Sequence, residues 1–483
     1  MAIADLQDTH SAAPDQHGAQ RGAPPRADLS HIPGPSAPPL IGHTVAIVKD
    51  GYAFHRAAIA RYGEVYRYRM FGNQAVALSG PDALEFVLMD RDRIFSSQHG
   101  WDVIARLFSR GLMLRDFDDH RRHRRIMQAA FKSPAMADYL SRMNQELDRL
   151  VADWPVDTPF RFYPAVKALT LRLGGAVFMG FDTGSGSNHG PLKADPGTAG
   201  SAEIDRVNAA FVDEVRATIG LVRRPLPFTA MRRGVRSRAW LNDRFARLIA
   251  ERRAQVASDG GGEDFFTQMC LATDEEGNRW TDDEIVDHFN FLLMAAHDTT
   301  STALAKMAWA LAAYPEWQAR LAEEVAALDG AALTLDSLGR MEQTEWVFKE
   351  ALRLMPPVPF LPRRAVQDFE WGGYRIPAGA RVQVSPGLVM ASPELYTDPE
   401  RFDPERFAPD RAEDRRHRFA WAPFGGGAHK CIGMNFATMQ VKAFTVALLS
   451  RRRLAPADGS ATAWRRLPIP QPVGGLPVRL TAA

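Results

Sequence analysis

The chain of 483 residues carries a formal net charge of +2, and 24% of its residues are charged, so its composition excludes strongly basic nucleic-acid-binding proteins and long acidic tails. Its only two cysteines, Cys270 and Cys431, are too far apart to suggest a disulfide framework, which agrees with a reducing, cytoplasmic location. The chain is long enough to bury a large pocket. It contains no repeat, phosphate-binding loop or dinucleotide-binding fingerprint, so a fused reductase domain is not expected.

The first thirty residues are expected to form a tail. Residues 1–30 are rich in Ala, Pro, Gln, Asp and His and lack an apolar segment that could serve as a signal peptide or a membrane anchor. We predict that this tail is disordered and ends at the Pro- and Gly-rich hinge 31–42. No Pro-, Gly- or Ser-rich linker divides the remainder, so residues 31–483 are predicted to form one unit.

Helical patterns dominate that unit, and short strands flank them. Alternating apolar residues and Gly-containing turns predict a hairpin on either side of the helical region. The predicted elements are a helix over 51–62, strands over 65–70 and 74–78, helices from 82 to 353 with a loop over 184–200, and strands over 367–371, 374–376 and up to 384. The expected fold class is therefore mainly α with small β-sheets.

One helix is predicted to be unusually long. Thr281 and Glu284 have the spacing of a capping box at its start, and Pro315 ends it. At 1.5 Å per residue this helix would be about 50 Å long, enough to cross the molecule. The segment 295–300 at its centre consists of small and polar residues, which are poor helix formers. Hydroxyl groups that bond back to the preceding turn would loosen the helix there and leave room for small molecules.

Three consecutive glycines, 425–427, precede Cys431. Glycines let the backbone adopt positive φ and approach a flat ligand closely. The apolar, helix-forming run 432–449 follows, so we expect the sulfur near a helix N-terminus, where N–H groups favour a thiolate. The alternative is a Gly-rich loop followed by a buried structural cysteine. A zinc site is less expected, because no further cysteine lies near His429 and Cys431 to complete it.

The segment Phe424-Gly-Gly-Gly-Ala-His-Lys-Cys-Ile-Gly resembles the signature Phe-x-x-Gly-x-Arg-x-Cys-x-Gly of the cytochrome P-450 family of haem-thiolate monooxygenases. The sequence matches at Phe424, Gly427, Cys431 and Gly433 and has His429 in the arginine position. The resemblance covers roughly 31–480. It implies the family's triangular fold, with the long central helix over the haem, and Cys431 as the ligand of iron in haem b (iron protoporphyrin IX). A thiolate ligand favours O–O bond cleavage at haem iron.

The resemblance assigns further residues to the long helix. Asp298 and Thr299 match the acid and the threonine of the family's oxygen-activation motif, and Ala296 replaces its usual glycine. The two residues are therefore expected to assist protonation of dioxygen. The alternative for this stretch is a polar patch at a subunit contact.

A buried charge network is also implied. Glu350 and Arg353 match the family's Glu-x-x-Arg helix, and Arg406 matches its Pro-Glu-Arg-Phe segment. The three residues would fix the loop that carries Cys431. The same spacing of Glu and Arg recurs at Glu413 and elsewhere, where ion pairs in solvent are expected.

The two propionates of haem require cations. His120 and Arg124 lie four residues apart on a predicted helix over 119–131, in the positions of the family's propionate-binding helix. The rest of the expected cofactor contacts are His429, Arg363 (with Arg364 as the alternative), Phe424 and Gly425. We expect Arg121, Arg122 and Arg125 to form a basic face in solvent.

Apolar side chains are expected to line a substrate cavity, although each could equally belong to the core. They are Trp101, Ile104, Leu107, Phe108, Phe211, Ile219, Leu221, Phe291, Ala295, Val358 and Phe360. Together they favour a lipophilic substrate such as a terpenoid, a steroid or a retinoid-like molecule. His297 and the three glycines are closer to sterol- and retinoid-type members of the family.

The resemblance implies a soluble, monomeric monooxygenase without a membrane anchor. Such an enzyme hydroxylates its substrate with O₂ and two electrons from a ferredoxin, which an NAD(P)H-dependent ferredoxin reductase reduces. An acidic ferredoxin would be steered to Arg121, Arg122, Arg125 and Lys430. Peroxide-driven hydroxylation is less expected, because it has less need of Asp298 and Thr299. A haem-based sensor or carrier would need Cys431 but no oxygen-activation motif.

Overall fold

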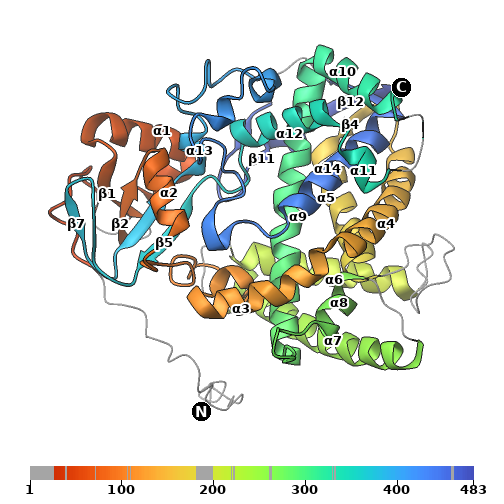
Figure 1. The fold of residues 1–483 in the computed structure, drawn as a ribbon, viewed down its shortest axis with the longest axis horizontal. Coiled ribbons are helices and arrows are strands. Elements are labelled where there is room, and N and C mark those ends of the chain that lie inside the picture. The colour runs from red at the N-terminus through yellow and green to blue at the C-terminus, as the bar shows by residue number, and fades with distance from the viewer. Residues whose placement is uncertain are drawn as a thin grey trace.

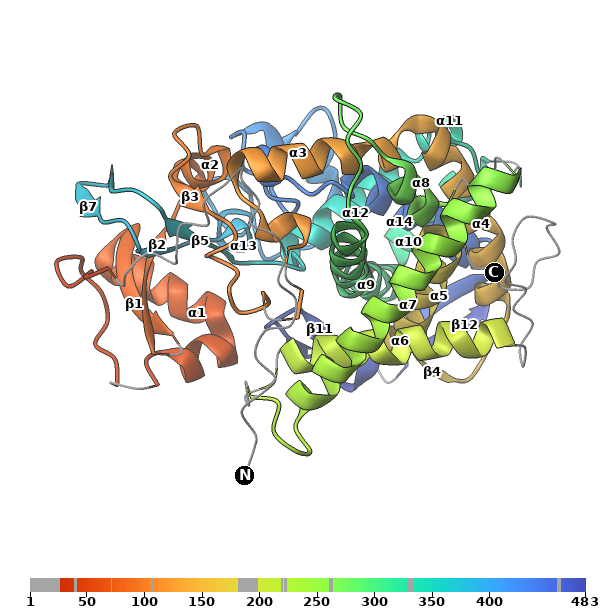
Figure 2. The ribbon, with the colours of Figure 1, turned by 90° about the horizontal axis from the view of Figure 1, so that it is seen from below.

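The computed structural model is mostly helical with small sheets, which confirms the predicted fold class. The structure describes residues 27–38, 41–70, 72–105, 107–108, 110–180, 199–218, 220, 224–259, 264–328, 330, 333–457 and 462–483. Figure 1 shows a strand-rich part around β1, β2 and β5 beside a larger helical part, with α9 running through the latter. In the perpendicular view α9 is seen end-on, with α3 on one side and the α6–α7 pair on the other (Figure 2).

Fourteen α-helices are present in the described part of the chain. They are α1 (Thr44–Tyr62), α2 (Pro81–Met89), α3 (Phe117–Gln128), α4 (Ser133–Ala152), α5 (Phe162–Leu173), α6 (Ala199–Thr218), α7 (Ala230–Asp259), α8 (Phe265–Leu271), α9 (Asp282–Ala313), α10 (Pro315–Ala326), α11 (Leu335–Leu338), α12 (Glu342–Leu354), α13 (Pro386–Val389) and α14 (Met434–Leu449). A π-helical turn, Gly174–Phe178, extends α5.

Twelve short strands form four small sheets within the same residues. They are β1 (Val65–Met70), β2 (Asn73–Leu78), β3 (Phe95–Ser96), β4 (Pro159–Arg161), β5 (Leu361–Ala365), β6 (Phe369–Trp371), β7 (Tyr374–Ile376), β8 (Arg381–Val384), β9 (Arg452–Pro456), β10 (Trp464–Arg465), β11 (Gln471–Pro472) and β12 (Pro477–Ala482). The five-stranded sheet has the order β1-β2-β8-β5-β3, in which only β2 and β8 are parallel. The other sheets are β4-β12-β9, β6-β7 and β10-β11.

Most local predictions agree with these elements. The hairpins β1–β2 and β6–β7 occur where they were predicted, with Val65 opposite Leu78 in the first. The first helix begins earlier than predicted, at Thr44, although its backbone departs from helical geometry at Asp50 (φ −154°, ψ 89°). Of the predicted loop 184–200, residues 184–198 lie outside the described residues, and α6 begins at Ala199, before the predicted end of the loop.

The predicted tail falls mostly on residues 1–26, which lie outside the described residues. Residues 27–30 are described, and Leu29 is only 1% exposed and packs in the core of the strand-rich part with Ile32. The packed structure therefore begins at least two residues before the predicted boundary at residue 31.

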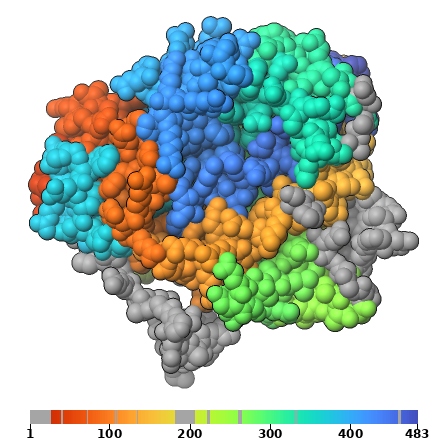
Figure 3. Space-filling model, viewed as in Figure 1, coloured from red at the N-terminus to blue at the C-terminus, as the bar shows by residue number. Residues whose placement is uncertain are grey.

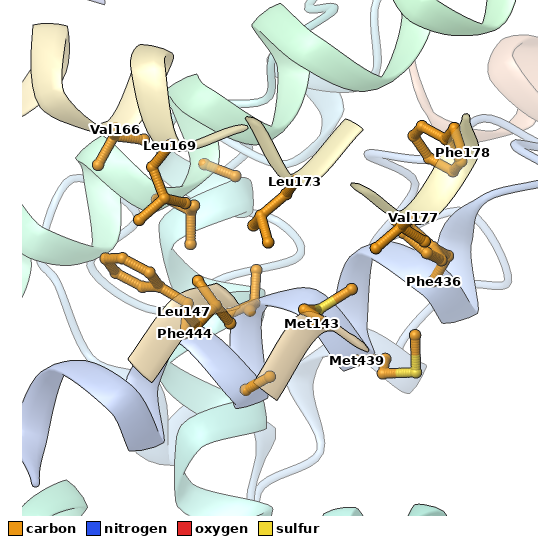
Figure 4. Packing of buried hydrophobic residues seen from close by; sticks show 14 of the residues in the cluster. Met143, Leu147, Val166, Leu169, Leu173, Val177, Phe178, Phe436, Met439 and Phe444 are labelled. Atoms are coloured by element: carbon orange, nitrogen blue, oxygen red, sulfur yellow. The ribbon is translucent and has the colours of Figure 1, made fainter. Parts of the chain in front are cut away.

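The main core lies between the helices around α9. Figure 4 shows side chains of α4, α5 and α14 packed against each other, with Met143 and Leu147 from α4 facing Leu173 and Phe444. Burial of each such side chain contributes roughly 1.5–3 kcal/mol to folding. The segment Gly427–Leu449 is long and apolar enough to cross a membrane, but 61% of the 18-residue window that gives its mean hydropathy of 1.3 is buried inside the protein, as in a core helix.

The central helix α9 begins and ends as predicted. Thr281 accepts a hydrogen bond from the Glu284 amide at 3.3 Å, and the Glu284 carboxylate accepts one from the Thr281 amide at 2.9 Å. This reciprocal capping box satisfies two otherwise unpaired N–H groups at the helix start. The helix then runs through 32 residues to Ala313, before Pro315.

Candidate functional site

The loop that carries Cys431 is held by its own backbone. The Cys431 amide donates to the Phe424 carbonyl oxygen at 2.9 Å. Gly425 and Gly427 have φ of +68° and +61°, and a Cβ at Gly427 would lie 1.9 Å from the carbonyl oxygen of Leu88. Gly427 is therefore required both for its conformation and for its close approach to α2.

Cys431 is exposed, whereas the other cysteine, Cys270, is buried. The protein atoms packed around the Cys431 sulfur desolvate it and raise the pKa of its thiol. The Gly433 N–H, Arg124 and Lys430 act in the opposite direction. These three groups favour the thiolate, as expected, but desolvation has the larger effect on the pKa. A bound metal would deprotonate the thiol outright. In the space-filling view, the blue C-terminal segments reach the surface between the orange region around α3 and the green helices (Figure 3).

The four predicted propionate ligands gather near Cys431. The imidazole rings of His120 and His429 lie 3.9 Å apart between centroids. Burial lowers the pKa of His120 to about 4, and Arg124 acts in the same direction. Burial likewise lowers the pKa of His429 to about 2, with Arg363 as the next cause.

Neither arginine of this group forms an ion pair within the described ranges, although Asp116 and Asp90 act on the Arg363 charge from longer range. Arg363 is 6% exposed, and its guanidinium donates to the carbonyl oxygen of its neighbour Pro362 at 2.9 Å. Among the described residues, no acid forms an ion pair with Arg124 or Arg363. Arg364, the alternative, instead donates to the Gly379 carbonyl oxygen at 3.1 Å. Two unpaired arginines beside a cysteine fit a flat, dianionic cofactor such as haem.

The predicted charge network is buried and contains a fourth member. Glu350 accepts hydrogen bonds from Arg353 at 2.7 and 2.9 Å and from Arg406 at 3.2 Å. Arg406 also donates to Glu413 at 2.7 Å. Glu413 was predicted to form a pair in solvent but is only 2% exposed. The prediction was wrong because the spacing between Glu413 and Arg416 in the sequence gives no information on the burial of Glu413.

Tyr396 connects this network to the cysteine loop. Its ring centroid lies 5.0 Å from the guanidinium carbon of Arg353 and 5.7 Å from that of Arg406. Its hydroxyl donates to the carbonyl oxygen of Ala420 at 3.0 Å. The network therefore supports the segment four residues before Phe424. The sequence contained no signal for Tyr396.

The centre of α9 carries a second cluster. The Thr299 hydroxyl donates to the Ala295 carbonyl oxygen at 2.6 Å, one turn before it. Asp298 lies 2.7 Å from Lys167 Nζ and 3.2 Å from His297 Nδ1. Burial raises the pKa of Asp298, but His297 and Lys167 outweigh it and hold this pKa at about 2. Asp298 is therefore ionised at neutral pH. Lys167, on α5, was not predicted.

The apolar positions divide into two groups. Four of them are at most 8% exposed and belong to the main core: Leu107, Phe108, Phe211 and Phe291. For these four, the sequence had left open whether they line a cavity or belong to the core. The partly buried positions are Trp101, Ile104, Ala295, Val358 and Phe360. Ile219 and Leu221 lie outside the described residues.

The expected basic face is largely ion-paired. Arg121 lies 2.9 Å from Asp118, Arg122 lies 3.7 Å from Asp274, and Arg125 lies 3.4 Å from Glu275. The face is exposed as expected, but these acids reduce its positive charge. Steering of an acidic partner would therefore be weaker than the sequence suggested.

Comparisons with known proteins agree with this geometry. Residues 32–463 match the family model described as Cytochrome P-450. The chain is 39% identical over 465 residues to the putative cytochrome P-450 136 of Mycobacterium tuberculosis, covering 95% of this chain and 90% of the relative. It is 30% identical to the cyclooctat-9-en-7-ol 5-monooxygenase of Streptomyces melanosporofaciens, covering 92% and 93% of the two chains.

The same fold occurs in a solved structure. The retinoic acid bound cyanobacterial CYP120A1 superimposes with a TM-score of 0.81 at 26% identity, covering 94% of this chain and 100% of the other. The family match spans residues 32–463, which is most of the chain. The chain belongs to the cytochrome P-450 family of haem-thiolate monooxygenases.

Proposed function

We propose that this enzyme hydroxylates a lipophilic small molecule of the terpenoid, steroid or retinoid-like class with O₂ and two electrons from a ferredoxin. The observation that carries the proposal is the exposed Cys431, which lies near His120, His429 and two arginines, Arg124 and Arg363, that form no ion pair in the described part of the chain. The proposed cofactor is haem b. We further propose that the enzyme is a soluble, cytoplasmic monomer, reduced through an NAD(P)H-dependent ferredoxin reductase.

Different residues would bind the iron, the macrocycle and the propionates of the cofactor. Cys431 would bind the iron, and Phe424 and Gly425 would contact the macrocycle. Arg124 and Arg363 would pair with the propionates, and each pair would offset the burial of an arginine that has no other carboxylate partner in the described residues. When bound, the haem supplies the activation of dioxygen.

Asp298 and Thr299 would supply protons for that reaction. Thr299 Oγ1 carries a proton that it donates to the Ala295 carbonyl oxygen, so the hydroxyl must turn away from that oxygen to release it. The ionised Asp298 can accept a proton from solvent and return one to the hydroxyl. Lys167 would hold Asp298 in place for this exchange.

The names of similar proteins support the substrate class. One relative is named for the oxidation of cyclooctat-9-en-7-ol, and the similar solved structure binds retinoic acid. The partly exposed apolar side chains of Val358 and Phe360 agree with a lipophilic ligand.

Oxygen-isotope labelling tests the proposal. The haem-loaded enzyme would be incubated with NADPH, a ferredoxin, its reductase, ¹⁸O₂ and a panel of terpenoids, steroids and retinoids. The expected result is a product that carries one ¹⁸O atom and forms only when all components are present. A product that forms equally well with peroxide alone, or no product from any compound together with no consumption of NADPH, would contradict the proposal.

A further inference from the structure

The turn between β10 and β11 carries an arginine without an acidic partner. Arg466 is partly buried, and its guanidinium carbon lies 4.8 Å from the centroid of the Tyr52 ring on α1. No carboxylate in the described ranges forms an ion pair with it, whereas Arg56, one turn after Tyr52, pairs with Glu400 at 2.8 Å. The Arg466 guanidinium also hydrogen-bonds the Tyr52 side chain, so Tyr52 orients a cation that forms no ion pair among the described residues.

A buried lysine faces the same turn. Lys306 of α9 is 5% exposed, and its Nζ lies 3.3 Å from the ring centroid of Trp309 and 5.5 Å from that of Trp464. Burial lowers the pKa of Lys306 to about 7, and Arg466 acts in the same direction. Trp464 Nε1 is buried and has no hydrogen-bond acceptor among the described residues. This region thus has more donors and positive charge than acceptors.

The arginine adjoins the apolar segment before β5. The Tyr52 and Phe360 ring centroids lie 5.7 Å apart, and a Cβ at Gly51 would lie 3.2 Å from Phe360 and 3.5 Å from Leu467. The same turn reaches α9, because the Thr302 hydroxyl donates to the Pro470 carbonyl oxygen at 2.7 Å. Thr302 lies three residues after Thr299. The turn therefore connects the unpaired arginine to the apolar positions assigned to the substrate.

We propose that Arg466, positioned by the Tyr52 ring, binds the carboxylate of a lipophilic monocarboxylic acid, which is the substrate class of this enzyme. The inference rests on the proposed function, because it names the substrate of that reaction. An inorganic anion is disfavoured, because apolar side chains of Phe360 and Leu467 border the site. With the carboxylate at Arg466, the apolar part of the molecule would contact Phe360 beside the Tyr52 ring.

Calorimetric titration of the haem-loaded enzyme tests this assignment. The probes are retinoic acid, palmitic acid and abietic acid, each compared with the corresponding alcohol at pH 7.5. We expect at least one acid to bind about tenfold or more tightly than its alcohol. Arg466→Gln should weaken binding of that acid about 10- to 100-fold, which is the effect of losing a charge-assisted hydrogen bond. Binding of the alcohol should change by less than about threefold in the same variant.

A matched variant serves as the control. Arg465→Gln removes the exposed neighbouring arginine and should keep the preference for the acid. The proposal fails if no acid binds more tightly than its alcohol. It also fails if Arg466→Gln weakens acid and alcohol equally, if Arg465→Gln has the same effect as Arg466→Gln, or if millimolar phosphate displaces the acid.

The proposed function is tested separately by the incorporation of ¹⁸O. If an acid is preferred through Arg466 but no compound acquires ¹⁸O, the oxygenase proposal fails and the carboxylate site stands. If alcohols acquire ¹⁸O but no acid is preferred, only the carboxylate site fails.

Discussion

Arg406 and Glu413 form an ion pair of 2.7 Å in which both side chains are almost completely removed from solvent. The pair extends the cluster of Glu350 and Arg353, so two buried arginines are balanced by two buried carboxylates. Removal of one carboxylate would leave an uncompensated buried charge, which is far more costly than the loss of an ion pair in solvent.

Glu413→Gln is therefore expected to lower the free energy of unfolding by about 3–5 kcal/mol. Glu405→Gln is a matched control, because Glu405 pairs with Arg320 at 2.8 Å and both side chains are exposed. The Glu405→Gln substitution should lower the free energy of unfolding by less than about 1 kcal/mol. Chemical denaturation followed by circular dichroism measures both values. Equal, small effects of the two substitutions would show that Glu413 is not part of the supporting network.

Thr299→Ala is expected to uncouple oxygen consumption from product formation. Substrate binding and reduction should stay intact, because the Thr299 hydroxyl contacts only the Ala295 carbonyl oxygen in the described structure. A positioned proton donor contributes about 10²- to 10⁴-fold to rate, so without it most of the O₂ consumed should appear as H₂O₂. Thr300→Ala, at the buried neighbouring position, should remain coupled. The opposite pattern would move the assignment by one residue, and coupling in both variants would refute the role of this stretch.

Asp298→Asn should slow product formation by about 10²-fold and increase the solvent isotope effect, because proton transfer becomes rate-limiting. Lys167→Met should raise the pKa of Asp298 above its value of about 2, since it removes a cation that holds this pKa low. Loss of activity on acidification should then begin at a higher pH in Lys167→Met than in the wild type. Superimposable pH profiles of the two proteins would contradict the proposed role of Lys167.

The pH dependence of stability should report on Glu214, a carboxyl group of α6 that is 0% exposed. Burial raises its pKa to about 8, against the opposing effect of Arg238. Because this pKa is above the unfolded value, the contribution of Glu214 to stability is fully present below about pH 4.5 and is lost as the pH rises through about 8.

Glu214→Gln removes this pH dependence. Relative to the wild type, the variant should therefore gain about 2 kcal/mol or more in free energy of unfolding between pH 5.5 and pH 8.5. The other groups that face this carboxyl are Arg238 of α7 and, through that arginine, Asp287 of α9. Asp213→Asn, which alters a more exposed pair with Arg233, is the control and should show no such trend. A difference that does not change with pH would contradict the assignment.

Local sequence patterns predicted many of the helices and strands and part of the candidate site. The capping box of α9 and the hairpins depend on residues within a few positions of each other, and these predictions were confirmed. The order of the five-stranded sheet could not be read in this way, because β2 and β8 pair residues as distant as Val76 and Val382. Likewise, Lys167 meets Asp298 from a helix more than 100 residues earlier, and no periodic pattern connects the two.

Besides the pairing of distant segments, the sequence did not reveal which charged side chains are buried. Glu350 and Glu413 each lie three residues before an arginine, and this spacing does not show that both carboxylates are buried. The resemblance to a known family distinguished Glu350 and not Glu413. Conversely, Arg121, Arg122 and Arg125 were predicted to form a basic face. The partner of Arg121, Asp118, lies on the same helix, but the partners of Arg122 and Arg125 lie on the distant segment of Asp274 and Glu275, which no local pattern connects to them.

The spectrum of the reduced carbonyl complex tests most directly the proposal that the Cys431 sulfur ligates haem iron. The wild type should bind one haem per chain and show the red-shifted Soret band that thiolate ligation produces. Cys270→Ser, which alters the only other cysteine, should leave that band unchanged, whereas Cys431→His should abolish it. A red-shifted band that persists in Cys431→His, or that disappears in Cys270→Ser alone, would contradict the assignment of Cys431.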